Sequence, residues 1–502
     1  MTVISQITSI LLSFIGRTFF IKFLSIEYLG INGLFSNILS LLSLAELGIG
    51  TAITYMMYKP IAEDDKERVA AYNQSFRKIY NWIGLFVLTG GLSLTPFIYH
   101  LIKEEPQISE NLYIIYALFV INTSVSYFYT YKRSLLIAYQ KEYINNQNII
   151  LFAVIKDVVL IALLYLFSDF YIYLIAQIII TIASNVTISI KTNKLFPEIV
   201  SMRPIKVQSN EFKIIVKNTM AMVCHKIGSV IVSGTSNIFV SYYVGLSMVG
   251  IYSNYIMIST AALQVVGKGI NSLTASFGNL VATSNRQDIY KVFRKIYFIN
   301  FVMALSIAII YYELVDSFIT IWIGDDFLLD PTTTIVIVVN SLFLYQMRIP
   351  AQMVINTCGL FWEIKWKSLV EAAVNLLCSF LFAGYCGLGI LGVLLAAFVS
   401  NVATNLWWEP YVAMKNGLKI PIKFYIIDFM KSSMIFVLTL IIVASINYLL
   451  STQLLSPLLY LLLRLIIAIV VIALIVLIAY GKSEEMHYVK SIVGKGLRSF
   501  RH

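Results

Sequence analysis

Long apolar runs separated by short polar segments dominate the sequence. Residues 458–479, for example, are apolar almost without a break, which is the length a helix needs to cross the ~30 Å hydrocarbon core of a bilayer. Strands of a membrane barrel would instead alternate apolar and polar side chains. Runs of about 18 residues or more predict spans over residues 3–24, 31–57, 79–102, 111–136, 149–167, 171–191, 216–242, 249–281, 296–322, 333–357, 368–386, 388–413, 431–450 and 456–480.

Composition and charge agree with this pattern. Of the 502 residues, 59% are apolar and only 13% are charged, about half the ~25% typical of a soluble domain. The pattern therefore predicts an all-α polytopic membrane protein with about 14 transmembrane helices. The net charge of +11 does not indicate a nucleic-acid partner, because the basic residues lie between apolar runs rather than on one polar domain. Most of them fall on the same side of the membrane as both termini, which the positive-inside rule makes cytoplasmic.

An internal repeat divides the chain into halves. The segment Gly33–Asn37 (GLFSN) recurs as Gly250–Asn254 (GIYSN), and Phe76–Tyr80 (FRKIY) recurs identically as Phe293–Tyr297, both at an offset of 217 residues. Because the repeat unit holds an even number of spans, the halves should be related by an axis along the membrane normal. We predict an N-lobe, a C-lobe, two extra helices and a cytoplasmic basic amphipathic tail, over residues 1–200, 201–425, 426–480 and 481–502.

Motifs of catalysis and cofactor binding are missing from the sequence or stand in the wrong context. The segment Gly387–Gly392 satisfies GxGxxG, and Glu409 follows at about the distance of a ribose-binding acid, but the segment joins two membrane spans rather than a strand and a helix. The four cysteines have no CxxC spacing, and only His225 lies well inside a span. We therefore expect no catalytic residue, no metal site and no cofactor.

Ionisable residues inside the predicted spans are the strongest chemical signal. Each buried Arg or Lys costs ~2.5–3.5 kcal/mol on insertion scales, so a surplus of bases indicates function. We predict a cationic, substrate-binding cavity formed by Arg17, Lys156, Lys226, Lys268 and Arg348, which would bind an anion. Glu46 and Asp157 are candidates for ion coupling or for counter-ions. The alternative is that each base pairs locally or snorkels, for example Arg17 with Glu46.

Several segments resemble one transporter family. Residues 16–65 (GRTFFIKFLSIEYLGINGLFSNILSLLSLAELGIGTAITYMMYKPIAEDD) closely resemble the opening of bacterial polysaccharide transporters of the O-antigen and capsule repeat-unit flippase type. The segments SLTASFGNLVA (272–282), FITIWIGDDF (318–327) and GILGVLLAAFVS (389–400) are similar to the wider multidrug, oligosaccharidyl-lipid and polysaccharide exporter superfamily. The resemblance implies two six-helix lobes and alternating access around a central cavity. Among the predicted basic residues, only Arg17 is similar in position to one of the cavity arginines of the related lipid II flippase.

The function implied by this resemblance is movement of undecaprenyl-pyrophosphate-linked oligosaccharides from the inner to the outer leaflet of a bacterial plasma membrane, for capsule, exopolysaccharide or O-antigen-like synthesis. Its partners would be the lipid-linked glycan, the bilayer and other polysaccharide-assembly membrane proteins, with no nucleic acid. Coupling to a H⁺ or Na⁺ gradient or to the membrane potential stays open. One alternative is a cation-coupled multidrug exporter, in which acids should dominate the cavity. A second, a membrane glycosyltransferase or polymerase, is disfavoured by the short outer loops.

Overall fold

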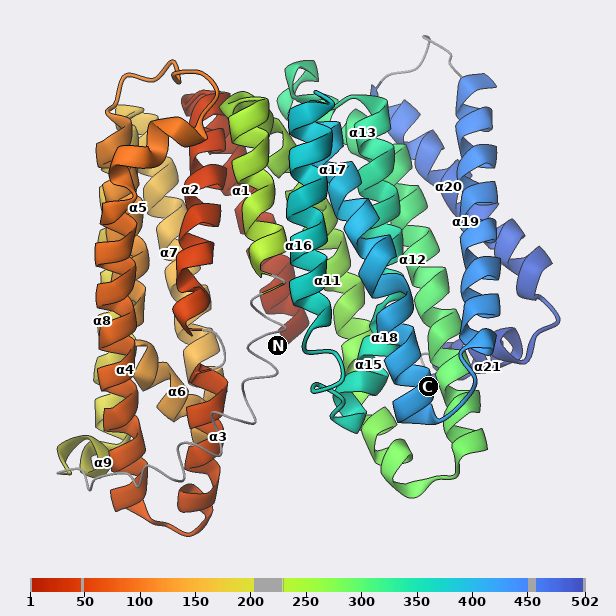
Figure 1. Ribbon diagram of the computed structural model, residues 1–502, viewed down its shortest axis with the longest axis horizontal. Coiled ribbons are helices and arrows are strands. Elements are labelled where there is room, and N and C mark those ends of the chain that lie inside the picture. The colour runs from red at the N-terminus through yellow and green to blue at the C-terminus, as the bar shows by residue number, and fades with distance from the viewer. Residues whose placement is uncertain (1, 47–48, 203–227, 229, 450–456, 500–502) are drawn as a thin grey trace. The chain divides into compact units, whose positions relative to one another are not determined.

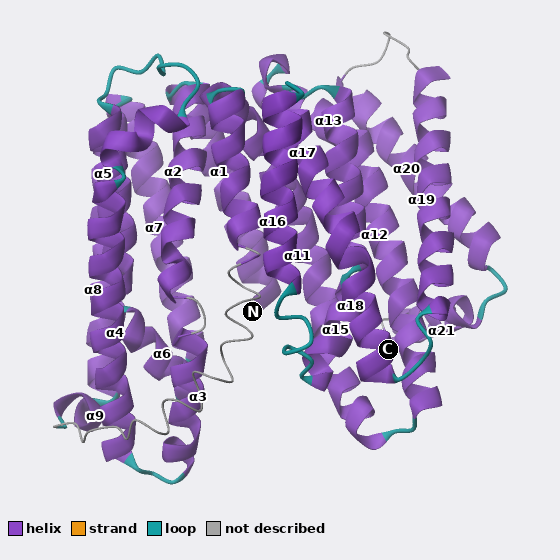
Figure 2. Ribbon diagram, in the orientation of Figure 1, coloured by secondary structure: helices purple, strands orange, loops and turns teal. Residues whose placement is uncertain are grey.

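The computed structural model describes residues 2–46, 49–202, 228, 230–449 and 457–499. Within these ranges the chain is mostly helical, with connecting loops and no strand (Figure 2). Ten helices are long and apolar enough to cross a membrane, or up to 11 when the bent pair Lys66–Ser93 and Thr95–Leu101 is taken as one span. The prediction of an all-α polytopic fold is confirmed, and the protein is a multi-pass membrane protein.

The chain forms two compact units, Met1–Ser253 and Asn254–His502. Residues 230–253, which the sequence analysis assigned to the second lobe, belong to the first unit. Hydrogen bonds agree with this assignment, because the Asn237 side-chain amide donates to the Gly33 carbonyl at 3.4 Å and the Lys103 N–H donates to the Ser241 carbonyl at 3.1 Å.

The first unit is a helical bundle whose elements follow the chain from red to yellow in Figure 1. Polar side chains cap several of its helices: Asp65 accepts from the Arg68 N–H and Asp169 from the Ile172 N–H. Aromatic side chains such as Phe35 and Tyr116 fill its core. Its elements are α1 (Thr2–Phe23), α2 (Ile26–Leu42), η1 (Ser43–Glu46), α3 (Ile49–Ala62), α4 (Lys66–Ser93), η2 (Thr95–Leu101), α5 (Leu112–Tyr127), α6 (Thr130–Ala138), α7 (Glu142–Phe167), α8 (Phe170–Leu195) and α9 (Pro197–Ser201).

The second unit contains four π-helical stretches inside otherwise α-helical spans, a feature often found near functional sites. Helix α11 (Leu246–Thr283) begins in the first unit and continues into the second. The remaining elements are α12 (Arg286–Ile323), η3 (Asp325–Phe327), α13 (Pro331–Val336), η4 (Ile337–Leu344), α14 (Tyr345–Met347), α15 (Ile349–Cys358), α16 (Lys367–Ser379), η5 (Phe380–Tyr385), α17 (Gly389–Ser400), η6 (Asn401–Asn405), α18 (Leu406–Val412), η7 (Ala413–Leu418), α19 (Lys423–Leu449), α20 (Pro457–Tyr480) and α21 (Glu484–Ser499).

The two extra helices are attached to the second unit by a buried carboxylate. Glu313 of α12 is fully buried and accepts two hydrogen bonds from the Asn447 amide of α19, at 2.6 and 2.7 Å. The Arg464 guanidinium of α20 lies 3.5 Å from the same carboxylate. Polar contacts therefore hold both α19 and α20 against α12, because a carboxylate inside a bilayer needs donors from its neighbours.

The repeated FRKIY motif has the same local geometry in both units. Phe76 and Tyr80 of α4 are buried with ring centroids 5.6 Å apart, and their counterparts in α12, Phe293 and Tyr297, are buried with centroids 6.3 Å apart. The arginine between each pair is exposed. The motif thus turns the same face toward the core of each unit, while the symmetry axis relating the two halves stays a prediction.

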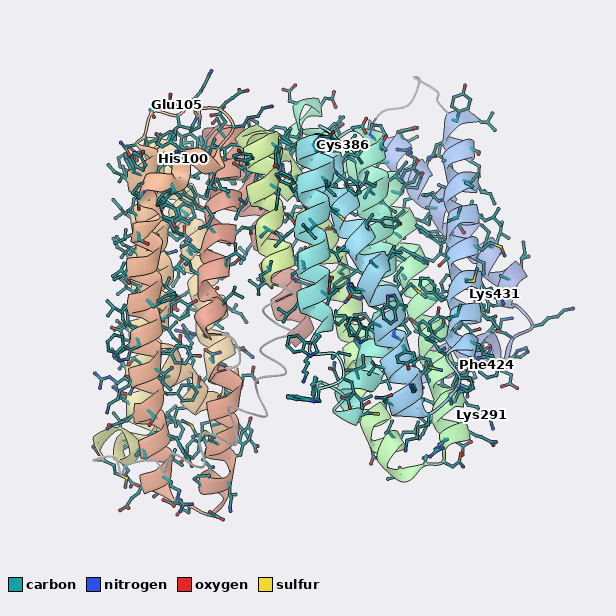
Figure 3. All side chains as sticks on the ribbon, in the orientation of Figure 1. His100, Glu105, Lys291, Cys386, Phe424 and Lys431 are labelled. Carbon is teal, nitrogen blue, oxygen red and sulfur yellow. The ribbon has the colours of Figure 1, made fainter. Side chains whose placement is uncertain are left out.

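The predicted orientation can be tested on the second unit. Lys291 and the exposed native Cys386 lie at opposite ends of that unit (Figure 3). In intact cells, a membrane-impermeant maleimide should label Cys386 in a variant that lacks the other three cysteines. A cysteine-free protein carrying Lys291→Cys should be labelled only after permeabilisation. Labelling of Lys291→Cys, and not of Cys386, in intact cells would reverse the predicted orientation.

Candidate functional site

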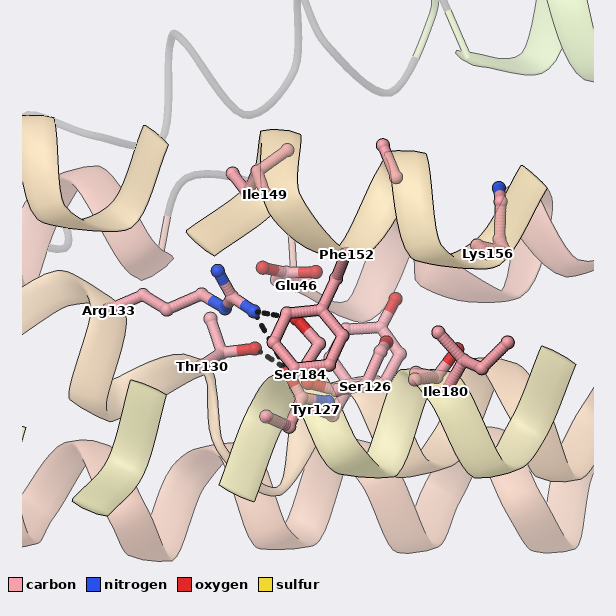
Figure 4. Close-up of a pocket in the computed structure, with 13 residues that line it drawn as sticks. Glu46, Ser126, Tyr127, Thr130, Arg133, Ile149, Phe152, Lys156, Ile180 and Ser184 are labelled. Carbon is pink, nitrogen blue, oxygen red and sulfur yellow. Dashed lines mark hydrogen bonds between the residues drawn. The ribbon is translucent and has the colours of Figure 1, made fainter. Parts of the chain in front are cut away.

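A cavity of about 440 Å³, open to its surroundings, lies between helices of the first unit. Its walls come from η1, α5, α6, α7 and α8, and three charged residues line it: Glu46, Arg133 and Lys156 (Figure 4). Ser126, Thr130, Ser184 and Asn185 add polar surface. The cavity therefore contains two basic groups and one carboxylate within a membrane-spanning bundle.

Helical periodicity places the polar wall of α7 in the cavity. Asn145, Asn148, Phe152 and Lys156 follow one another at intervals of three or four residues, so they share one face of the helix. Phe152 and Lys156 line the cavity directly, while the two asparagines contact the Arg133 side chain beside it. The opposite wall comes from α8, which contributes Ser184 and Asn185.

Neutral groups hold the Arg133 guanidinium. Its Nη1 donates to Asn145 Oδ1 at 2.6 Å, and its Nη2 contacts Asn185 Oδ1 at 3.1 Å and Asn148 Oδ1 at 3.3 Å. A further contact, to Ser184 Oγ, is 3.3 Å long. Within the described part of the chain no carboxylate forms an ion pair with Arg133. Amide dipoles orient this cation without neutralising its charge.

The carboxylate in the cavity has a different hydrogen-bond partner. Glu46 Oε1 accepts a hydrogen bond from the Tyr80 hydroxyl at 3.0 Å, and Tyr127 also lines the cavity. Lys156 has no ion-pair partner among the residues that the structure describes. At neutral pH the charged lining therefore carries a net charge of about +1, which favours an anionic over a cationic ligand.

The structure brings Lys156 and Glu46 together in this cavity, and it separates Asp157 from them. Lys156 faces the cavity, whereas Asp157 faces α1: a Cβ added at Gly16 would lie 3.8 Å from the Asp157 Oδ1. Adjacent residues of a helix point in different directions, so this separation follows from their positions on α7. Arg17 lies outside the cavity lining and donates from Nη1 to Ser253 Oγ at 2.9 Å. It forms no ion pair with Glu46 in the described contacts.

Arg348 lies in the second unit and is paired. Its guanidinium makes a bidentate contact with Glu409, with Nε 3.0 Å from Oε2 and Nη2 2.7 Å from Oε1. Lys367 donates to the same Oε1 at 2.9 Å, to Asn405 Oδ1 at 2.6 Å and to Glu371 Oε2 at 3.2 Å. Lys367 and Glu409 are each 1% exposed. We call Arg348, Lys367, Glu371 and Glu409 the buried charge network.

Two of the predicted basic site residues cannot be placed. Lys226 lies outside the described residues. Lys268 belongs to α11, but its side chain is outside the described part of the structure. For these two, the prediction of a cationic site stays a prediction.

Sequence reasoning did not include three important bases among the predicted site residues. Lys132 and Arg133 lie in the candidate span Leu112–Ala138, and Lys367 begins the candidate span Lys367–Tyr385. Lys132 is buried, with its Nζ 2.5 Å from Asn193 Oδ1. A signal for Arg133 was present in the sequence, because the asparagines at 145 and 148 precede the apolar run 149–167 at helical spacing with Lys156, so they form a polar stripe on one helix face. For Lys367 the signal was Glu371, one helical turn later.

Comparison with known proteins finds solved structures with a similar fold. No family model matches the sequence, and no curated protein matches it. Among solved structures, the lipid II flippase MurJ in an inward closed conformation aligns with a TM-score of 0.65 and 16% identity, over 95% of this chain and 97% of that one. An inward-facing multidrug resistance MATE family transporter of the MOP superfamily aligns with a TM-score of 0.63 and 15% identity, over 80% of this chain and 94% of that one.

The fold is that of the MOP superfamily transporters. A third MOP superfamily transporter, from Pyrococcus furiosus, aligns with a TM-score of 0.55 and 12% identity, over 83% of this chain and 95% of that one. Its published description states that a reversed polarity of its binding pocket suggests a different function. These likenesses concern the fold alone, and the polysaccharide-flippase type belongs to the proposal that follows.

Proposed function

We propose that this protein is a flippase that moves undecaprenyl-pyrophosphate-linked oligosaccharide repeat units across a bacterial plasma membrane by alternating access. The observation that carries the proposal is the Arg133 guanidinium, which lines a cavity inside the bundle and has no carboxylate partner among the described residues. An uncompensated arginine in a membrane span is costly. Binding of an anionic substrate group offsets that cost.

In this mechanism the protein breaks no covalent bond. The substrate's charged head enters the polar interior, where Arg133 and Lys156 supply positive charge, and its lipid tail stays in the bilayer. Lys156 acts as a flexible point charge, and Arg133 as a rigid, planar donor. We propose Glu46 as a group that couples transport to H⁺ or Na⁺ or serves as a counter-ion in the cavity. Other polysaccharide-assembly membrane proteins are the proposed partners, and both termini are proposed to lie in the cytoplasm.

A second candidate is a cation-coupled multidrug exporter, favoured by the likeness to the MATE family transporter. A cationic drug needs acids in its binding cavity. The described cavity contains one acid, Glu46, against two bases, and this polarity makes the exporter the weaker candidate.

Translocation in vesicles tests the proposal. Purified protein in liposomes should move a fluorescent lipid-linked oligosaccharide to the opposite leaflet at a rate several times that of protein-free vesicles, and should not accumulate a cationic dye. Dye transport without glycan translocation would favour the multidrug exporter. Failure to move either compound under imposed H⁺, Na⁺ and electrical gradients would contradict the flippase proposal.

Substitution of the predicted basic residues separates substrate contact from structural pairing. Arg17→Ala and Lys156→Ala should accumulate at normal levels and translocate less glycan, because neither residue has a described ion-pair partner and neutralising it removes an insertion cost. Arg348→Ala should instead lower the amount of folded protein, because it leaves Glu409 without its bidentate partner. The exposed Lys22→Ala is the control for both measurements. Wild-type translocation by the first two variants would exclude them from the substrate path.

A further inference from the structure

The cavity in the first unit lies at a break in a membrane span. Helix α5 ends at Tyr127 and α6 begins at Thr130, although both belong to the candidate span Leu112–Ala138. Ser126, Tyr127 and Thr130, which flank the break, all line the cavity. Interrupted backbone at membrane depth is tolerated where it borders protein or a polar cavity, so the break and the cavity belong together.

The start of α6 brings two positive features to the same place. The first N–H groups of a helix form the positive end of its dipole, and the side chain of the N-cap residue, Tyr129, makes no capping hydrogen bond. Arg133 lies in the first turn of α6. A cation at the positive end of a dipole is unfavourable, and no described carboxylate offsets it. This combination favours an anion at the break.

An orphaned donor is a second, independent indication of a ligand. Asn185 is only 4% exposed and lines the cavity. Its Oδ1 accepts from Arg133 at 3.1 Å, whereas its Nδ2 has no hydrogen-bond partner. Leaving a buried amide donor unsatisfied costs about 1–3 kcal/mol. Because the Asn185 carbonyl accepts from a cation, its N–H groups are polarised toward a negative acceptor.

The second base extends the site along α7. Asn148 contacts Arg133, and Lys156 comes eight residues later on α7. Eight residues correspond to ~12 Å along a helix. Figure 4 shows Lys156 and Arg133 well apart around the cavity. A second base in the same cavity raises its positive potential, which suits a multiply charged anion such as a diphosphate better than a single carboxylate.

We propose that the start of α6, Arg133 and Asn185 form the subsite for the diphosphate of the substrate, with Lys156 adding to the positive potential of the cavity. This inference rests on the proposed flippase function and assigns the atoms that recognise the headgroup. Glu46 lines the same cavity, so its charge opposes the bound phosphates. Removing the charge of Glu46 should therefore strengthen binding of the anion, and removing the donors should weaken it.

The test measures binding of inorganic pyrophosphate to the purified full-length protein in nanodiscs by isothermal titration calorimetry. Asn185→Asp is the sharpest variant, because it keeps the oxygen that holds Arg133 while replacing the orphaned donor with an anion. We expect it to weaken binding about tenfold or more, and Arg133→Gln to do the same. Glu46→Gln should tighten binding severalfold. Lys22→Gln, at an exposed base on α1, is the control and should bind as the wild type does.

Competition distinguishes the source of the phosphate. A lipid-linked diphosphate should displace pyrophosphate, and inorganic phosphate should bind more weakly than either. Equal binding of phosphate and pyrophosphate would overturn the diphosphate assignment, as would wild-type affinity in Asn185→Asp. If Arg133→Gln fails to fold, the pyrophosphate affinities of Asn185→Asp and Glu46→Gln still test the diphosphate assignment. Variant-sensitive pyrophosphate binding in a protein that never translocates lipid-linked glycan would leave the subsite standing and refute the flippase function.

Discussion

Replacing Glu409 with alanine is expected to lower the free energy of unfolding by about 3–5 kcal/mol. The carboxylate is 1% exposed, and it accepts from Arg348 at 2.7 and 3.0 Å and from Lys367 at 2.9 Å. Its removal leaves the Arg348 guanidinium without its anion in the membrane interior. Lys367 keeps Glu371 and Asn405 as partners, so most of the loss arises from Arg348. The measurements are the yield of monodisperse protein and the Tm in detergent.

A double variant distinguishes lost pairing from lost volume. Glu409→Met combined with Arg348→Met removes both charges and should recover much of the stability, because hydrophobic replacement of a whole buried pair is often close to neutral. For comparison, the exposed pair of Lys66 and Glu198 has its charged atoms 2.8 Å apart with side chains 42% and 64% exposed. Lys66→Ala should therefore leave the Tm almost unchanged, because solvent screens an exposed pair. A double variant less stable than Glu409→Ala would contradict the pairing argument.

Replacing Gly30 with alanine is the second substitution with a large expected effect. Helix α2 approaches the start of α11 so closely that a Cβ at Gly30 would overlap the Leu246 carbonyl oxygen and lie 2.7 Å from its carbon. The contact is reciprocal, since a Cβ at Gly250 would lie 2.6 Å from the Ile26 carbonyl oxygen. Backbone atoms cannot move aside as a flexible side chain can. We expect a loss of stability at or above the ~1–3 kcal/mol typical of overpacking, seen as a lower Tm and yield.

Gly90 provides the matched control. It lies inside α4, and a Cβ there would have no neighbour within 4 Å. Gly90→Ala should be neutral or stabilise the protein by up to about 1 kcal/mol, because alanine favours a helix interior over glycine. Equal stability of Gly30→Ala and Gly90→Ala would show that α2 and α11 do not pack as closely as described.

The spans were predictable from sequence because a bilayer imposes a length and a polarity on each helix. The candidate helices Glu142–Phe167, Phe170–Leu195 and Leu458–Tyr480 correspond to apolar runs that can be recognised without any knowledge of their neighbours. The FRKIY repeat was equally accessible, since its two copies are identical, and its residues occupy the same face of α4 and α12. Local pattern was sufficient for these features.

The partners of the charged residues were not predictable in the same way. Lys156 and Glu46 were predicted as site residues and line the cavity, but Arg133 and Lys367 were not predicted, because they lie at the ends of the predicted spans 111–136 and 368–386, where the apolar pattern gives way to polar residues. Their partners come from other helices: Asn185 lies 52 residues after Arg133, and Glu409 lies 42 residues after Lys367. A linear pattern contains no information about which helix faces which.

The sequence by itself determined the class of protein, the approximate spans, the repeated halves and the excess of basic residues, because each depends on the transfer of single residues or short runs into the bilayer. Tertiary structure decided which of those bases remain without a carboxylate. Packing of α6 against α7 and α8 surrounds Arg133 with amides, whereas packing of α15, α16 and α18 joins Arg348 to Glu409 and Lys367. The free energy of a buried charge depends on its neighbours in space, and only the folded chain defines those neighbours.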